Sequence, residues 1–169
     1  MTHHGRGTPP GGGDEASAGR DAGASWSLFE PPDLCVGVFI GDISEAEMRR
    51  MLTNQRRMAE GKEYILVLTD LSRMTGLSAG ARRCAAQGSI DSPVRGIASF
   101  GVKPTLRVIS SVVFKAINLL RGSNSAPFAF VATEAEARAW IEARRREILA
   151  ATKGGGGAPR PPGRGAPPE

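Results

Sequence analysis

The residues best placed for chemistry follow one apolar run, from Tyr64 to Leu68. Consecutive apolar side chains cover both faces of a strand, which is typical of the middle of a sheet with helices on both sides. Asp70 and Ser72 fall at the carboxyl end of the strand that this run predicts. Open α/β sheets place ligand and partner sites at the carboxyl ends of their strands. We therefore expect Asp70 and Ser72 to mark the functional edge of the domain.

The chain lacks the residues that most catalytic mechanisms require. Both histidines, His3 and His4, lie in a Gly-rich head, so a Ser-His-Asp triad and a histidine-bound metal are not expected. Cys35 and Cys84 form no CxxC pair and lie in apolar patterns, which favours core thiols over a zinc site. Neither a GxGxxG nor a P-loop motif occurs. Asp70 could act as a general base, but a single carboxylate after a strand is more often a cap. We expect no enzymatic activity, metal or cofactor.

Ser78 is the best N-cap in the segment after the central strand, because its hydroxyl can accept from the free N–H groups of a following helix. That helix is short and alanine-rich, so a loop, a partner or a ligand could approach the sheet closely. A phosphate on Ser78 would suit the helix N-terminus and would change the surface by about two charges. Together with Asp70, Ser72, Arg82 and Arg83, Ser78 forms the expected partner edge and is a candidate phosphoacceptor.

The segment 105–121 predicts an unusually apolar helix. At 100° per residue, its ordinary core stripe consists of Leu106, Ile109, Val113, Ala116, Ile117 and Leu120. Val108, Val112 and Phe114 widen the apolar surface beyond this stripe. We expect them to form an exposed patch of the kind that marks a partner, a membrane surface or a ligand mouth. The alternative is that the final helix or a tail covers them.

Turn, cap and periodicity signals predict an α/β domain with a mixed central sheet of about five strands and four helices. The expected strands are 26–30, 34–40, 64–70, 95–100 and 128–131, and the expected helices are 45–60, 79–87, 105–121 and a final one from 134. Capping boxes at Ser44 and Thr133 open the first and the last helix. Arg73 to Leu77 is expected to be a loop, and Trp140 a core anchor.

Both ends of the chain lack the large apolar residues that a core needs. We expect disordered tails at 1–24 and 152–169 around one domain at 25–151. The start shows no secretory signal, and the most apolar helix contains Arg107 and Lys115, so a cytoplasmic protein without a membrane span is expected. The net charge is +5, but no aromatic residues interleave with the basic ones, so no nucleic-acid partner is expected.

The order of the expected elements is also that of the STAS superfamily. Its bacterial anti-sigma-factor antagonists open the helix after the central strand with Asp-Ser-Ser-Gly, where this chain reads Leu77-Ser-Ala-Gly80. The chain more closely resembles the SpoIIAA-like family, over about Trp26 to Leu149. The segments that carry this resemblance are Asp70-Leu-Ser72, Ala81-Arg-Arg83, Arg95-Gly-Ile-Ala98, Lys115-Ala-Ile-Asn-Leu-Leu120 and Thr133-Glu-Ala-Glu-Ala-Arg-Ala-Trp140. The resemblance implies a small sheet with helices, no known catalysis, and either a lipid or other apolar ligand or a protein partner.

Two functions stay open on the sequence alone. The first is a non-enzymatic regulatory module of STAS type that binds a protein partner at the edge after the central strand. The second is a carrier or sensor of a lipid or other apolar ligand, held between the helix 105–121 and the sheet. A homodimer and at most peripheral membrane contact are compatible with both.

Overall fold

A computed structural model describes residues 23–88, 92–122 and 126–154 of the chain. Its elements are β1 Trp26–Glu30, β2 Leu34–Ile43, α2 Glu45–Ala59, β3 Ile65–Leu77, α3 Ala79–Gly88, β4 Val94–Phe100, α4 Pro104–Arg121, β5 Phe128–Val131 and α5 Glu134–Gly154. The α/β class, the mixed sheet of five strands and the four helices are confirmed. The last helix continues to Gly154, three residues beyond the expected end of the domain. Apart from these residues and residues 23 and 24, the expected tails lie outside the described residues.

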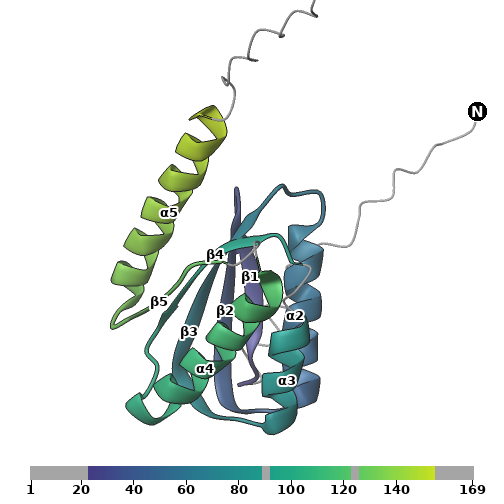
Figure 1. The fold of residues 1–169 in the computed structure, drawn as a ribbon. Coiled ribbons are helices and arrows are strands. Elements are labelled where there is room, and N and C mark those ends of the chain that lie inside the picture. Colours follow the sequence, from purple (N-terminus) through teal and green to yellow (C-terminus); the bar gives the residue numbers. More distant parts are fainter. Residues whose placement is uncertain (1–22, 89–91, 123–125, 155–169) are drawn as a thin grey trace, which may run out of the picture.

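The five strands lie in the order β1-β2-β3-β4-β5. The β1 strand runs antiparallel to β2, and β2 to β5 are parallel. Parallel crossovers are right-handed, so three successive crossovers in one direction place α2, α3 and α4 on the same face of the sheet. The helix α5 follows the last strand and covers the opposite face (Figure 1). The sheet is thus enclosed by three helices on one side and one on the other.

The β3 strand is the centre of both cores. Leu66 and Leu68 pack with Ala137 and Ile141 of α5. The alternate residues Ile65 and Val67 point to the side of α2, α3 and α4. Side chains of successive residues point to opposite faces of a strand, so a run of apolar residues fills both cores. The expectation of a strand buried on both faces is confirmed.

The β3 strand is longer than expected, and the prediction of a loop from Arg73 to Leu77 is wrong. The β2 strand also continues, to Ile43, and its last residues pair with this part of β3, including Asp42 with Gly76 and Ile43 with Leu77. The β4 strand stops at Phe100. The end of β3 is therefore a two-stranded extension that projects beyond the rest of the sheet.

The helix starts have the expected N-caps, but neither capping box closes, since in α5 the Glu136 carboxylate accepts from the N–H of Ala132, one residue before the cap, at 2.9 Å. The Ser44 hydroxyl accepts from the backbone N–H of Glu47 at 3.2 Å. The Glu47 carboxylate accepts from the backbone N–H of Ser25 at 3.2 Å, so it joins α2 to the start of β1 rather than closing a capping box. At α5 the Thr133 hydroxyl accepts from the N–H of Glu136 at 3.2 Å. Both predicted N-caps are confirmed.

Candidate functional site

The structure contains an apolar cavity between the sheet and the layer formed by α2, α3 and α4. Its volume is about 120 Å³, and it is partly open to the surface. The residues that line it are Phe39, Met48, Leu52, Gln55, Val67, Thr69, Leu71, Met74, Leu77, Ala85, Val94, Ile97, Ser110, Val113 and Phe114. The cavity therefore lies between the apolar helix and the sheet, where the second hypothesis predicts the ligand site.

Small side chains on two helices leave this space. Ala85 of α3 and Ser110 of α4 are buried at the cavity, where larger residues would fill it. Ala81, one turn before Ala85, is completely buried and lets α3 approach its neighbours closely. The alanine-rich composition of the helix after Ser78 is the sequence signal for this arrangement.

Two of the three polar residues of the cavity wall, Gln55 and Thr69, form hydrogen bonds within the protein. The Thr69 hydroxyl lies 2.6 Å from the Ser99 hydroxyl. The Gln55 amide donates to the Ser92 hydroxyl at 3.3 Å. None of the lining residues carries an ionisable side chain. The cavity thus presents an apolar surface that suits an apolar ligand and offers no acid or base for catalysis.

Phe114 lies on the inner side of α4, so the prediction that it shares an exposed face with Val108 and Val112 is wrong. Its ring stacks on Phe128 with the ring centres 5.3 Å apart, and it meets Phe130 edge-on at 5.6 Å. The β5 strand supplies both partners, so the two phenylalanines draw Phe114 inward to the rim of the cavity. Val108 and Val112 are 67% and 61% exposed, which confirms their place off the core stripe.

The predicted partner edge has no topological switch point among the described strands. Ligand sites at the carboxyl ends of strands arise where the strand order reverses, and the order of the described parallel strands never does. Asp70 lies within β3, paired with Val38 and Phe100, and its carboxylate accepts from the N–H of Ser72 at 2.8 Å. Ser72 is exposed, and Gly101 packs against its backbone. Asp70 is thus a local anchor within the longer strand.

Ser78 is the N-cap of α3, as predicted. Its hydroxyl accepts from the N–H of Ala81 at 3.1 Å, and its side chain is half-buried. The Arg82 guanidinium donates to the carbonyl of Leu77 at 3.1 Å and so braces the same turn. Arg83 is exposed. The structure therefore brings Ser78 and Arg82 together at the start of α3, with Asp70 and Ser72 several residues earlier on β3.

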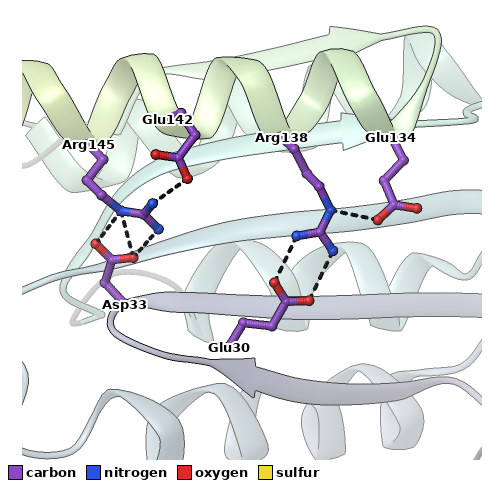
Figure 2. A network of polar contacts seen from close by, with 6 residues as sticks. All are labelled: Glu30, Asp33, Glu134, Arg138, Glu142 and Arg145. Carbon is purple, nitrogen blue, oxygen red and sulfur yellow. Dashed lines mark hydrogen bonds and ion pairs between the residues drawn. The ribbon is translucent and has the colours of Figure 1, made fainter.

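Two arginines of α5 hold this helix to the β1-β2 hairpin, a contact that the sequence reading missed (Figure 2). Arg138 makes two hydrogen bonds to the Glu30 carboxylate, at 2.8 and 3.0 Å. Arg145 binds the buried carboxylate of Asp33, with a shortest distance of 2.6 Å. Planar guanidinium-carboxylate pairs of this kind fix the orientation of the partners. Arg145, the middle of three consecutive arginines at 144–146, is half-buried and paired.

These contacts shift several pKa values. The hydrogen bonds from Arg138 lower the pKa of Glu30 below its ordinary value. Burial, followed by the hydrogen bond with Asp33, raises the pKa of Tyr64. Burial raises the pKa of the Cys35 thiol from 9.0 to about 12, so this cysteine is a protonated core residue at neutral pH. The shifted groups lie at α5 or within the core and not at the predicted edge.

The described part of the chain contains neither a candidate metal cluster nor a candidate membrane-spanning helix. Residues 23–88, 92–122 and 126–154 contain no group of three or more His, Cys, Asp or Glu side chains that could hold a metal ion. Among the helices of these same segments, none combines the length and the apolar character that crossing a membrane requires.

Comparison with known proteins supports the fold. No protein-family model matches the chain, and no curated protein matches it. A crystal structure of an uncharacterised DUF3478 protein with a SpoIIAA-like fold, from Shewanella loihica PV-4, matches with a TM-score of 0.52 and 16% identity, over 69% of this chain and 91% of that chain. At this identity the likeness concerns the fold. The SpoIIAA-like α/β fold implied by the sequence resemblance is thus confirmed.

Proposed function

We propose that the protein is a non-enzymatic module that binds a small apolar ligand in the cavity between α4 and the sheet, as a carrier or a sensor. The observation that carries this proposal is a cavity of about 120 Å³ whose lining residues include no ionisable group. An apolar cavity of about 150 Å³ engineered in another protein binds benzene. The size therefore suits a ring of that kind or the end of an aliphatic chain.

Energetics support a ligand over a simple packing defect. At about 24 cal/mol per Å³, a fully enclosed cavity of this size would cost about 3 kcal/mol of folding free energy, which is the upper bound for this partly open space and a large share of the usual stability of a domain. Exchanging Ala85 or Ser110 for a larger apolar residue would remove that cost. A ligand that fills the space restores the lost contacts and stabilises the folded state in proportion to its concentration.

The test uses two neighbouring valines of α4. Val113→Phe adds a ring on the buried side that lines the cavity, and Val112→Phe adds the same ring on the exposed side. Native mass spectrometry of freshly purified protein should show an apolar adduct on the wild type and on Val112→Phe, and none on Val113→Phe. An equal adduct on both variants would place the ligand elsewhere. A wild type without any adduct, and without affinity for added benzene, would reject the proposal.

The other hypothesis, a protein partner at the edge of Asp70, Ser72, Ser78, Arg82 and Arg83, draws support from the exposed side chains of Ser72 and Arg83. The remaining three residues are half-buried and bond within the chain. A pull-down from the native host with the wild type and with Arg83→Glu tests it. A protein captured by the wild type but not by the variant would support a partner site at this edge. Equal capture by both proteins would contradict it.

A further inference from the structure

The outer face of α4 carries a line of exposed aliphatic side chains. Val108, Val112 and Leu119 are 67%, 61% and 83% exposed. Their spacing of four and seven positions places them on one side of the helix. Among the described residues, Leu149 of α5 is the remaining large apolar side chain with comparable exposure. Three of four such residues thus form one stripe, which we call the α4 stripe.

Positive charge surrounds the α4 stripe. Lys103, Arg107 and Lys115 are exposed, and within the part of the chain that the structure describes none of them has an acidic partner. The guanidinium of Arg107 lies 5.9 Å from the ring centre of Phe130, which holds it against the surface. The helix itself contains no Asp or Glu. The stripe is therefore flanked by unpaired cations.

The charge asymmetry extends beyond this one helix. Residues 71–133 contain eight Lys or Arg and one acidic residue, Asp91, although the whole chain has 22 basic and 17 acidic residues. This segment includes α3, which lies beside α4 in the same layer (Figure 1) and exposes Arg83. The outer surface of α3 and α4 is thus cationic over more than one element.

Aliphatic side chains bordered by cations complement a membrane surface that carries anionic lipids. Val and Leu can enter the boundary of the acyl chains while Lys and Arg meet phosphates, which is the way amphipathic helices lie on membranes. A second copy of the chain is disfavoured, because stacking two α4 helices would bring like charges together. Protein interfaces favour aromatic anchors, and the exposed apolar residues of the stripe are all aliphatic.

We propose that the outer face of α4 docks on a membrane surface that contains anionic lipids, with the helix in the plane of that surface. The residues that would enter the boundary are Val108, Val112 and Leu119, and those that would meet the phosphates are Lys103, Arg107 and Lys115. The proposal does not rest on ligand binding, because the cavity is lined by the opposite side of the helix. Val113→Phe should therefore leave docking unchanged.

The test is sedimentation of the full chain with vesicles of phosphatidylcholine alone or with 30% phosphatidylglycerol. We expect binding to the mixed vesicles, much weaker binding to the neutral ones, and loss of binding in 0.5 M NaCl because salt screens the attraction. Leu119→Ser should weaken binding about tenfold, whereas the matched Leu149→Ser on α5 should not. Lys115→Gln should weaken it about fivefold, and Arg146→Gln, also on α5, should have little effect.

Three results would overturn the proposal. Equal binding to neutral and anionic vesicles would remove the role of the cations. If Leu119→Ser and Leu149→Ser lose vesicle binding equally, the α4 stripe has no specific role, and binding depends only on the general hydrophobicity of the surface. A wild-type dimer in analytical ultracentrifugation that becomes a monomer with Leu119→Ser, together with no vesicle binding, would show that a second copy covers the stripe.

Discussion

Val112 and Val113 are consecutive residues of α4 that face opposite ways: Val113 is 9% exposed and lines the cavity, and Val112 is 61% exposed on the outer face. One helix therefore separates an apolar interior from an apolar stripe outside. The inner side supports ligand binding, and the outer side supports docking. Substitutions at neighbouring positions can test the two roles independently.

Ser78→Ala should reduce the free energy of unfolding by about 1 kcal/mol, since the N-cap hydroxyl satisfies the N–H of Ala81. Ser72→Ala is the matched control, because the Ser72 side chain is exposed and lies outside the cap. Urea unfolding measures both. Equal stabilities of wild type and Ser78→Ala would remove the cap assignment.

Arg145→Met should destabilise the domain by about 3 kcal/mol, because it leaves the buried carboxylate of Asp33 without its partner. Arg146→Met, next to it but exposed, should change stability by less than about 0.5 kcal/mol. The double variant Asp33→Asn, Arg145→Met should recover part of the loss. If both single arginine variants unfold at the same urea concentration, Arg145 does not hold α5 in place.

Stability should fall in acid through Glu30. Its pKa is lowered in the folded state, mainly by the hydrogen bonds from Arg138, so its contribution is present above the ordinary value of 4.5 and is lost as the pH falls through the folded-state pKa. Arg138→Met should therefore show a smaller decrease in stability between pH 6 and pH 3 than the wild type, measured by urea unfolding. Parallel pH profiles for the two proteins would contradict the assignment.

Cys35 should resist thiol reagents in the native protein. Burial raises its pKa from 9.0 to about 12, so at pH 8 it is neither accessible nor ionised. Titration with a disulfide reagent should label Cys84, which is half-buried, and should label Cys35 after urea is added. Because the folded-state pKa is the higher one, stability should also decrease as the pH rises above 9. If Cys35 and Cys84 react with the reagent at the same rate in the folded protein, this prediction is wrong.

Much of the fold follows from local signals in the sequence. The β1 and β5 strands have the predicted bounds, and Ser44, Ser78 and Thr133 cap the helices they were expected to open. The extension of β3 was missed because Met74 to Leu77 has the composition of a turn. It becomes a strand because the end of β2 pairs with it, and that pairing is a tertiary effect.

The candidate site was predicted in part. The wide apolar helix pointed to a ligand beneath α4, but a cavity depends on volumes that residues from several elements leave unfilled. Phe114 was misplaced because its position is decided by Phe128 and Phe130 of another element. The two arginine contacts join residues that are far apart in the sequence, with separations of 108 and 112 positions. The sequence signal for them was the spacing of Arg138 and Arg145, which lie two turns apart on α5.

The most direct test of the cavity is a thermal melt with and without saturating benzene, on the wild type, Val113→Phe and Val112→Phe. A ligand that binds the folded state alone raises the melting temperature. The wild type and Val112→Phe should gain several degrees, and Val113→Phe, whose ring occupies the space, should gain none while it stays folded without benzene. The same gain in Val113→Phe, or no gain in the wild type, would contradict a ligand site between α4 and the sheet.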